Sequence, residues 1–138
     1  MQPEFAEYQK QVVKNCQVLC EVLSGEGFRL VSGGSDNHLV LVDVKSSTGL
    51  TGKKAEELLD SVHITCNKNS IPFDEEKPAY CSGIRIGTPA MTTRGCREEE
   101  FRRIAHWIAD VLHNPEDKEV LNRVRKEVLE FTRKLPLY

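Results

Sequence analysis

The side chain best suited to chemistry in this sequence is an arginine placed between two isoleucines. The stretch reads Gly83-Ile84-Arg85-Ile86-Gly87. Because side chains alternate between the two faces of a strand, the isoleucines would anchor to a core while Arg85 points the opposite way. An arginine held in this manner presents a planar fork that can grip a carboxylate through two parallel hydrogen bonds. The alternative is an edge strand with one solvated arginine, and the local pattern leaves both open.

A second candidate is the polar stretch over residues 67–74, which carries two asparagines, a lysine and a proline. Loops of this composition commonly carry ligand contacts on a rigid scaffold. The alternative is a plain surface connection.

The composition argues against several classes of function. The 138 residues are 39% hydrophobic and 29% charged, and 19 basic against 21 acidic side chains give a net charge of −2. Nucleic-acid-binding domains are normally basic, so no nucleic-acid partner is expected. No apolar run approaches the roughly 20 residues needed to cross a bilayer, and the first residues lack the apolar core of a signal peptide. We therefore expect one domain over residues 1–138, a cytoplasmic location and no membrane partner.

The five cysteines favour free thiols, because their number is odd and the chain resembles a cytosolic protein. The four histidines are scattered, and the sequence has no paired C-x-x-C segments with the ligand spacing of a zinc site. We expect no structural metal.

The elements that must position these side chains can be predicted from periodicity. Apolar residues at steps of three and four indicate helices over residues 3–25, 53–62, 98–113 and 117–134. Strands are expected over residues 28–31, 38–44, 62–66 and 82–87. The near-continuous apolar run of 38–44 is typical of a strand central in its sheet or covered on both faces.

Residues 32–37 are rich in turn formers and indicate a hairpin connection, whereas 45–52 and 67–74 are expected to be polar loops. The order of elements predicts an α+β fold, with a small, mostly antiparallel sheet of three or four strands and helices packed on it.

Three segments taken together resemble a known family. They read G-G-S-D-N-H-L-V-L-V-D (33–43), N-K-N-S-I-P (67–72), and S-G-I-R-I-G-T-P-A (82–90) followed by T-R-G (93–95). In this order and spacing they resemble the C-terminal part of serine hydroxymethyltransferase, and the resemblance extends over essentially the whole chain.

The resemblance implies a pyridoxal phosphate (PLP) enzyme with the fold of the aspartate-aminotransferase superfamily, PLP fold type I. Such an enzyme moves a one-carbon unit between serine and tetrahydrofolate and leaves glycine. The family's substrate-carboxylate arginine falls on Arg85, and its folate-contacting asparagine falls on Asn69. Lys68 and Ser70 lie in the same folate-binding loop. Arg94 matches a family arginine with a structural or supportive role.

The resemblance also implies partners. In the family, this C-terminal domain lies against a large PLP-binding domain of the same enzyme, within a homodimer or a tetramer. The catalytic lysine of the family sits in a T-T-T-H-K segment, which this sequence does not contain. The aspartate and histidine that contact the cofactor ring and the glycine-rich phosphate-binding residues are missing too.

We therefore expect a C-terminal domain that begins where the large domain would end. No catalytic residue is expected in this chain, and neither bound cofactor nor activity is expected in isolation. A lone exposed arginine–carboxylate pair contributes only about 0–1 kcal/mol, so affinity must come from a closed, desolvated site shared between domains.

Two other interpretations remain open. The α+β layout and single carboxylate-binding arginine would also suit a free-standing amino-acid-binding regulatory module. The chain could instead be a structural or interaction fragment, with an exposed apolar face where the large domain belongs.

Overall fold

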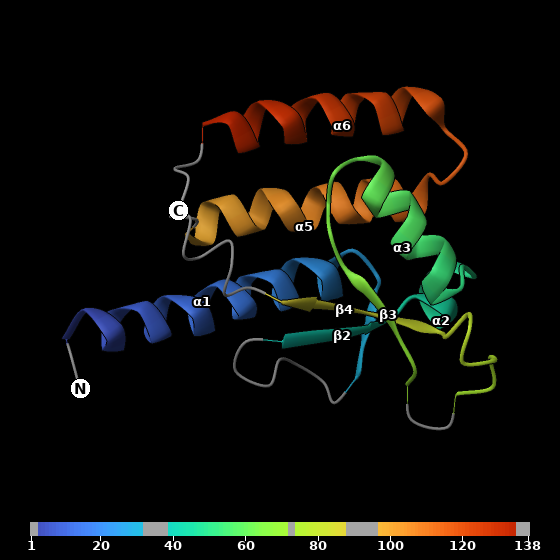
Figure 1. Ribbon diagram of the computed structural model, residues 1–138, viewed down its shortest axis with the longest axis horizontal. Helices are drawn as coiled ribbons and strands as arrows, with labels where there is room; N and C mark the ends of the chain where they lie inside the picture. The colour runs from blue at the N-terminus through green and yellow to red at the C-terminus, as the bar shows by residue number, and fades with distance from the viewer. Residues whose placement is uncertain (1–2, 32–38, 72–73, 88–96, 135–138) are drawn as a thin grey trace.

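The computed structural model describes residues 3–31, 39–71, 74–87 and 97–134. Its elements, in chain order, are α1 (Pro3–Gly25), β1 (Arg29–Leu30), β2 (Leu39–Asp43), α2 (Val44–Thr48), α3 (Gly52–Ser61), β3 (Asn67–Asn69), β4 (Gly83–Gly87), α5 (Glu98–His113) and α6 (Lys118–Arg133). A small antiparallel sheet with helices packed on it confirms the predicted α+β class (Figure 1).

The four described strands form one sheet in the order β1-β2-β4-β3, and every neighbouring pair is antiparallel. The central place of β2 confirms the position predicted from its apolar run. Val40, Val42, Ile84 and Ile86 are at most 6% exposed and form the core face of the sheet. In register, Val40 pairs with Ile86 and Val42 pairs with Ile84, so one face of the two central strands is continuously apolar.

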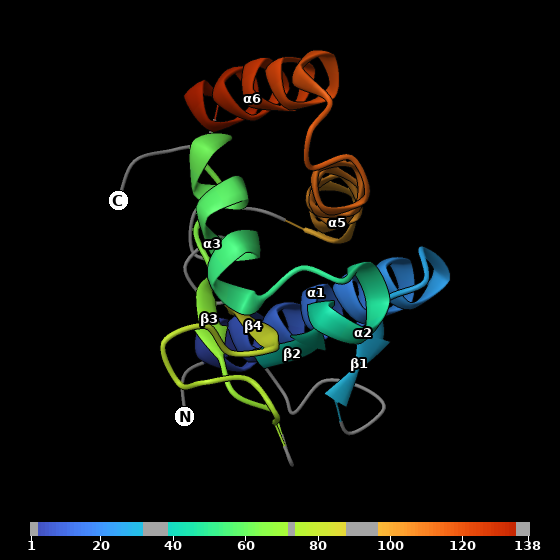
Figure 2. The same cartoon turned by 90° about the vertical axis from the view of Figure 1, so that its right-hand side faces the viewer.

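The helices stack in layers away from the sheet. Figure 1 shows α6 as the outermost helix and α5 between α6 and the level of α1 and the strands, and Figure 2 shows the same order from the side. In the inward stripes predicted for α5 and α6, Phe101 and Ile108 of α5 and Val124, Val128 and Phe131 of α6 are each 7% exposed or less. Val120 and Leu121, which were also predicted to face inward from α6, are half-buried, and Leu135 lies outside the described residues.

The strand predicted over 62–66 is wrong, since this segment ends helix α3. His63 has a left-handed backbone with φ of 67°, its N–H donates to Asp60 O, and the N–H of Ile64 donates to Leu59 O at 2.8 Å. These two bonds are the Schellman pattern, which usually places glycine where His63 stands. Without that glycine the sequence gives no stop signal, and the apolar residues Val62 and Ile64 imitate a strand. The strand that pairs with β4 is Asn67–Asn69, in the predicted polar loop.

The loop predicted over 45–52 is wrong in its first half, which forms the short helix α2. The side chain of Asp43 accepts from Ser46 N at the start of α2, and Gly49 ends the helix with φ of 82°. An aspartate N-cap and a left-handed glycine are sufficient to close one helical turn.

No helix in the described part of the chain is long and apolar enough to cross a membrane. Among those described residues, Tyr80, at 43%, is the exposed large hydrophobic side chain. The exposed apolar face considered for an interaction fragment stays a prediction.

Candidate functional site

Arg85 lies at the middle of β4, an interior strand with β2 on one side and β3 on the other. It is exposed, whereas its neighbours Ile84 and Ile86 are buried. The structure therefore has the alternation expected from the sequence, and the alternative of an edge strand is wrong. No acidic side chain in the described ranges forms an ion pair with the guanidinium of Arg85.

The register of β3 places two asparagines on the same face as Arg85. Asn67 is directly opposite Arg85, and Asn69 is opposite Gly83. Residues paired across neighbouring strands share a face of the sheet, so these side chains lie on the side turned away from the core. Asp43 of β2 also pairs with Gly83 and belongs to this side. We name this surface the polar face, and its residues are Arg29, Asp43, Asn67, Asn69 and Arg85.

Lys68 lies on the opposite face of the sheet. It pairs with the buried Ile84, and its backbone N–H donates to Glu56 Oε2 of α3 at 2.7 Å. Ser70 follows the end of β3, is exposed, and has its Oγ 3.6 Å from Cys81 Sγ.

The structure thus brings two of the predicted site residues to one surface, and these are Arg85 and Asn69. Asn69 is half-buried and its side-chain Nδ2 donates to Ser70 O at 2.8 Å, which fixes the amide at the strand end. Lys68 is separated from both by the sheet. Arg94 falls within residues 88–96, outside the described part of the chain.

Asp43 is the buried acid of the polar face, with 1% of its surface exposed. It accepts from the Arg29 guanidinium, from Ser46 N at 3.1 Å and from Ser46 Oγ at 2.7 Å. Burial alone would raise the pKa of Asp43, but the hydrogen bonds from Ser46 and the Arg29 charge outweigh it and lower the pKa below 3.8. Asp43 is therefore an ionised anchor at neutral pH.

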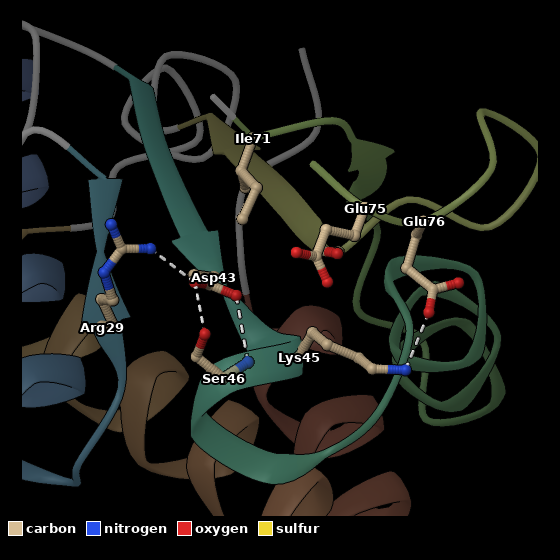
Figure 3. Close-up of a pocket in the computed structure, with 8 residues that line it drawn as sticks. Arg29, Asp43, Lys45, Ser46, Ile71, Glu75 and Glu76 are labelled. Atoms are coloured by element: carbon tan, nitrogen blue, oxygen red, sulfur yellow. Dashed lines mark hydrogen bonds and ion pairs between the residues drawn. The ribbon is translucent and has the colours of Figure 1, made fainter. Parts of the chain in front are cut away.

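A cavity of about 280 Å³ opens beside Asp43. Figure 3 shows the Arg29–Asp43–Ser46 group on one side of it and Glu75 and Glu76 on the other. Across the cavity, Lys45 Nζ lies 2.9 Å from Glu76 Oε1. The cavity therefore lies between the Arg29–Asp43 ion pair and the Lys45–Glu76 ion pair.

Asp74 joins the two ends of the segment that connects β3 to β4. Its Oδ1 accepts from Glu76 N at 2.8 Å and from Ser82 Oγ at 2.6 Å. Its Oδ2 accepts from Ile71 N at 3.2 Å and from Ser82 N at 2.9 Å. Burial acts to raise the pKa of Asp74, and the hydrogen bonds from Ser82, Glu76 and Ile71 lower it below 3.8.

Sequence reasoning missed three of these residues. Asp43 carried a signal, since aspartate is one of the residues preferred at the N-cap of a helix. Asn67 was assigned to a loop, and the alternation of side chains between two faces applies only within a strand. Asp74 had no local signal, because it stands beside two glutamates in an acidic run and its donor Ser82 lies eight positions later.

No described lysine fits the attachment site of PLP. A Schiff-base lysine needs a pocket that tunes its amine, and each described lysine is exposed except Lys68, which is half-buried on the core side of β3.

In the described ranges, the thiols and the possible metal ligands provide no further site. Cys16, Cys20, Cys66 and Cys81 are buried. Cys66 and Cys81 are free thiols, as the odd cysteine number predicted. Burial, with the nearby charges of Glu56 and Asp60, raises the pKa of Cys66 to about 12, which makes it a poor nucleophile. Within the residues that the structure describes, no three His, Cys, Asp or Glu side chains are grouped to hold a metal ion.

Comparison with known families supports the resemblance noted in the three segments. A model of the serine hydroxymethyltransferase family matches residues 1–108 of the 138. The match includes every described strand and extends from α1 into α5, so it contains the whole polar face. The full enzyme of this family is a transferase that uses PLP and folate. The chain belongs to the serine hydroxymethyltransferase family.

Proposed function

We propose that residues 1–138 form the C-terminal domain of a serine hydroxymethyltransferase, which interconverts serine and glycine with one-carbon transfer to tetrahydrofolate. In this proposal the polar face is one wall of the active site. The other wall belongs to a large PLP-binding domain of the same enzyme, within a homodimer or a tetramer.

The observation that carries the proposal is the placement of Arg85. Its backbone is held on both sides by β2 and β3, and its two isoleucine neighbours are buried. A guanidinium on a rigid interior strand can meet a carboxylate in a fixed, bidentate geometry. We assign to Arg85 the carboxylate of serine or glycine, because holding that group sets the orientation of the bond to be broken.

Asn69 supports the folate part of the proposal. Asn69 lies on the same face of the sheet as Arg85, on the neighbouring strand, so both side chains could line one binding site. Its amide can both donate to and accept from the pteridine end of a folate. Ser70 stands next to it and is exposed. We assign Lys68 a supporting role, through its backbone contact with Glu56, and keep Arg94 as a supporting residue.

We further propose that this chain is inactive by itself. PLP would supply the electron sink for the reaction, and the chain offers no enclosed lysine in its described part to hold it. An exposed arginine–carboxylate contact contributes only about 0–1 kcal/mol. The PLP-binding domain is therefore needed to enclose the polar face and exclude water.

A fusion protein tests the proposal. The 138 residues are placed behind the PLP-binding domain of a serine hydroxymethyltransferase, and serine-to-glycine conversion is measured with tetrahydrofolate. We expect activity in the fusion, and we expect Arg85→Gln to lower kcat/KM for serine by one to two orders of magnitude. That range follows from the roughly 1.5–3 kcal/mol of a hydrogen bond to a charged group. Arg102→Gln, which removes an exposed arginine of α5, is the matched control.

An unchanged kcat/KM for Arg85→Gln in an active fusion would contradict the assignment of Arg85. Calorimetry on the 138-residue chain alone addresses the regulatory-module alternative, for which millimolar or tighter binding of serine or glycine would be required. We expect no such heat, and no absorbance change when PLP is titrated into the chain.

A further inference from the structure

The connection between β3 and β4 links the two residues of the proposed site. Asn69 ends β3, Arg85 lies in β4, and residues 70–82 run between the two strands. A connection of this length does not fix the relation of its ends by turn geometry, as a two-residue hairpin would. Something else must hold the strand ends together.

Asp74 contacts both ends of this connection. Its Oδ2 accepts from Ile71 N, two residues after Asn69, and from Ser82 N, immediately before β4. Its Oδ1 accepts from Ser82 Oγ and from Glu76 N. Each oxygen is therefore shared between Ser82 and another part of the loop.

Ile71 and Ser82, which donate to Asp74, also make close contacts with the rest of the sheet and with α2. A Cβ added at Gly83 would lie 2.9 Å from Ile71 Cγ2 and 3.1 Å from Asn69 O, so the loop packs directly on the start of β4. Ser82 is 5% exposed, and its carbonyl accepts from Lys45 N at 3.0 Å. A change at Asp74 would therefore be transmitted to both strand ends.

We propose that Asp74 is a positioning residue, whose carboxylate sets the place of Asn69 relative to Arg85 and so aligns folate with the amino acid. This inference rests on the proposed function. In this proposal Asp74 contacts neither folate nor the amino acid. The charge matters because three of the four contacts come from backbone N–H groups, which require an acceptor, and an asparagine would present its NH₂ group to at least one of them.

The sharpest variant is Asp74→Asn, which keeps the shape and replaces one oxygen by a donor. Its matched control is Glu75→Gln, which makes the same carboxylate-to-amide change at the next residue, an exposed side chain. In the fusion we expect Asp74→Asn to raise KM for tetrahydrofolate about tenfold or more, and KM for serine by a smaller factor, with kcat changed less than KM. Glu75→Gln is expected to leave both KM values within twofold.

A second measurement tests the hydrogen bonds of Asp74 directly, without enzyme turnover. Amide hydrogen exchange in the 138-residue chain should accelerate at Ile71, Glu76 and Ser82 in Asp74→Asn and stay unchanged in Glu75→Gln. If Asp74→Asn does not fold, Ser82→Ala removes one donor and keeps the backbone bond from Ser82 N. We expect Ser82→Ala to raise KM for tetrahydrofolate about two- to fivefold.

The outcomes separate this inference from the proposed function. If Asp74→Asn lowers only the amount of active enzyme, so that kcat falls at unchanged KM, the residue is merely structural and the inference is overturned. If Asn69→Ala and Arg85→Gln impair the fusion while Asp74→Asn and Ser82→Ala leave both KM values unchanged, the inference alone fails. If Asn69→Ala and Arg85→Gln themselves have no effect, the proposed function fails and the inference falls with it.

Discussion

At the scale of single residues, two aspartates organise the surroundings of the polar face. Asp43 fixes the β1 side through Arg29 and caps α2 through Ser46. Asp74 gathers the donors of the connection that leads to β4. Both accept several hydrogen bonds, and both have pKa values lowered below 3.8. Their charged forms are therefore part of the folded structure, in the way that paired carboxylates commonly are.

The Asp43 charge predicts a pH-dependent stability. Because the folded-state pKa lies below the unfolded value of 3.8, the contribution is fully present above that value and is lost as pH falls through the folded-state pKa. We expect Asp43→Asn to lower the free energy of unfolding by about 1–3 kcal/mol at neutral pH. The difference from wild type should shrink below pH 3.8, as measured by urea denaturation across the pH range.

Asp60→Asn, at an exposed aspartate of α3, is the control and should change stability little. If the difference in free energy of unfolding between wild type and Asp43→Asn stays constant as pH falls through the acid range, the charge of Asp43 does not stabilise the fold.

At the scale of elements, the start of α3 is pressed against the start of β4. A Cβ added at Gly52 would lie 2.3 Å from the carbonyl oxygen of Gly83, which is backbone and cannot rotate away. Gly52 N also donates to Cys81 O at 2.9 Å. The contact between these two elements therefore requires glycine for space, although Gly52 has no special backbone angle, and it helps to hold the strand of Arg85.

Gly52→Ala is expected to destabilise the protein, because the added methyl group must push α3 away from β4. We expect a loss of about 1–3 kcal/mol, which is typical of overpacking a close contact. Gly25→Ala is the matched control, since a Cβ there meets nothing within 4 Å and the residue ends α1. Chemical denaturation of both variants should show a lower midpoint for Gly52→Ala, and equal midpoints would rule out the close approach.

At the scale of the whole molecule, α6 forms an outer layer on α5, on the far side of α5 from the strands (Figures 1 and 2). The interface contains an edge-to-face pair, with ring centroids of Trp107 and Phe131 5.4 Å apart. Arg103 stacks over both rings, with its guanidinium carbon 4.9 Å from the Trp107 centroid. Trp107 is the single tryptophan of the chain, so its fluorescence reports on this interface.

Phe131→Ala is expected to loosen α6 and lower the free energy of unfolding by about 3–5 kcal/mol, the usual cost of removing a buried phenylalanine. Trp107 fluorescence should shift to the red as water reaches the ring. Glu130→Ala, at an exposed neighbour on the same helix, should leave the emission unchanged. An unshifted spectrum for Phe131→Ala would mean that α6 does not cover Trp107 in solution.

Much of the fold could be predicted from local sequence patterns, because the helices and strands concerned depend on the spacing of nearby residues. The stripes of α1, α5 and α6 follow from the helical period, and the place of Arg85 opposite two isoleucines follows from the period of a strand. The family followed from motifs that are contiguous in sequence. The assignments of Arg85 and Asn69 to one site came from that resemblance, and the structure places both on one face.

Tertiary structure alone decided how these pieces are held. The Schellman end at His63 lacks its usual glycine, so a helix end was mistaken for a strand. Lys68 was separated from Asn69 because residues 67–69 form a strand, in which successive side chains point to opposite faces. The register with β4 decides which of the two faces Asn69 shares with Arg85. The four donors of Asp74 come from residues up to eight positions away, and the connection between β3 and β4 brings them together. Periodicity thus determined which face Arg85 occupies, and only the pairing of distant segments determined what stands beside it.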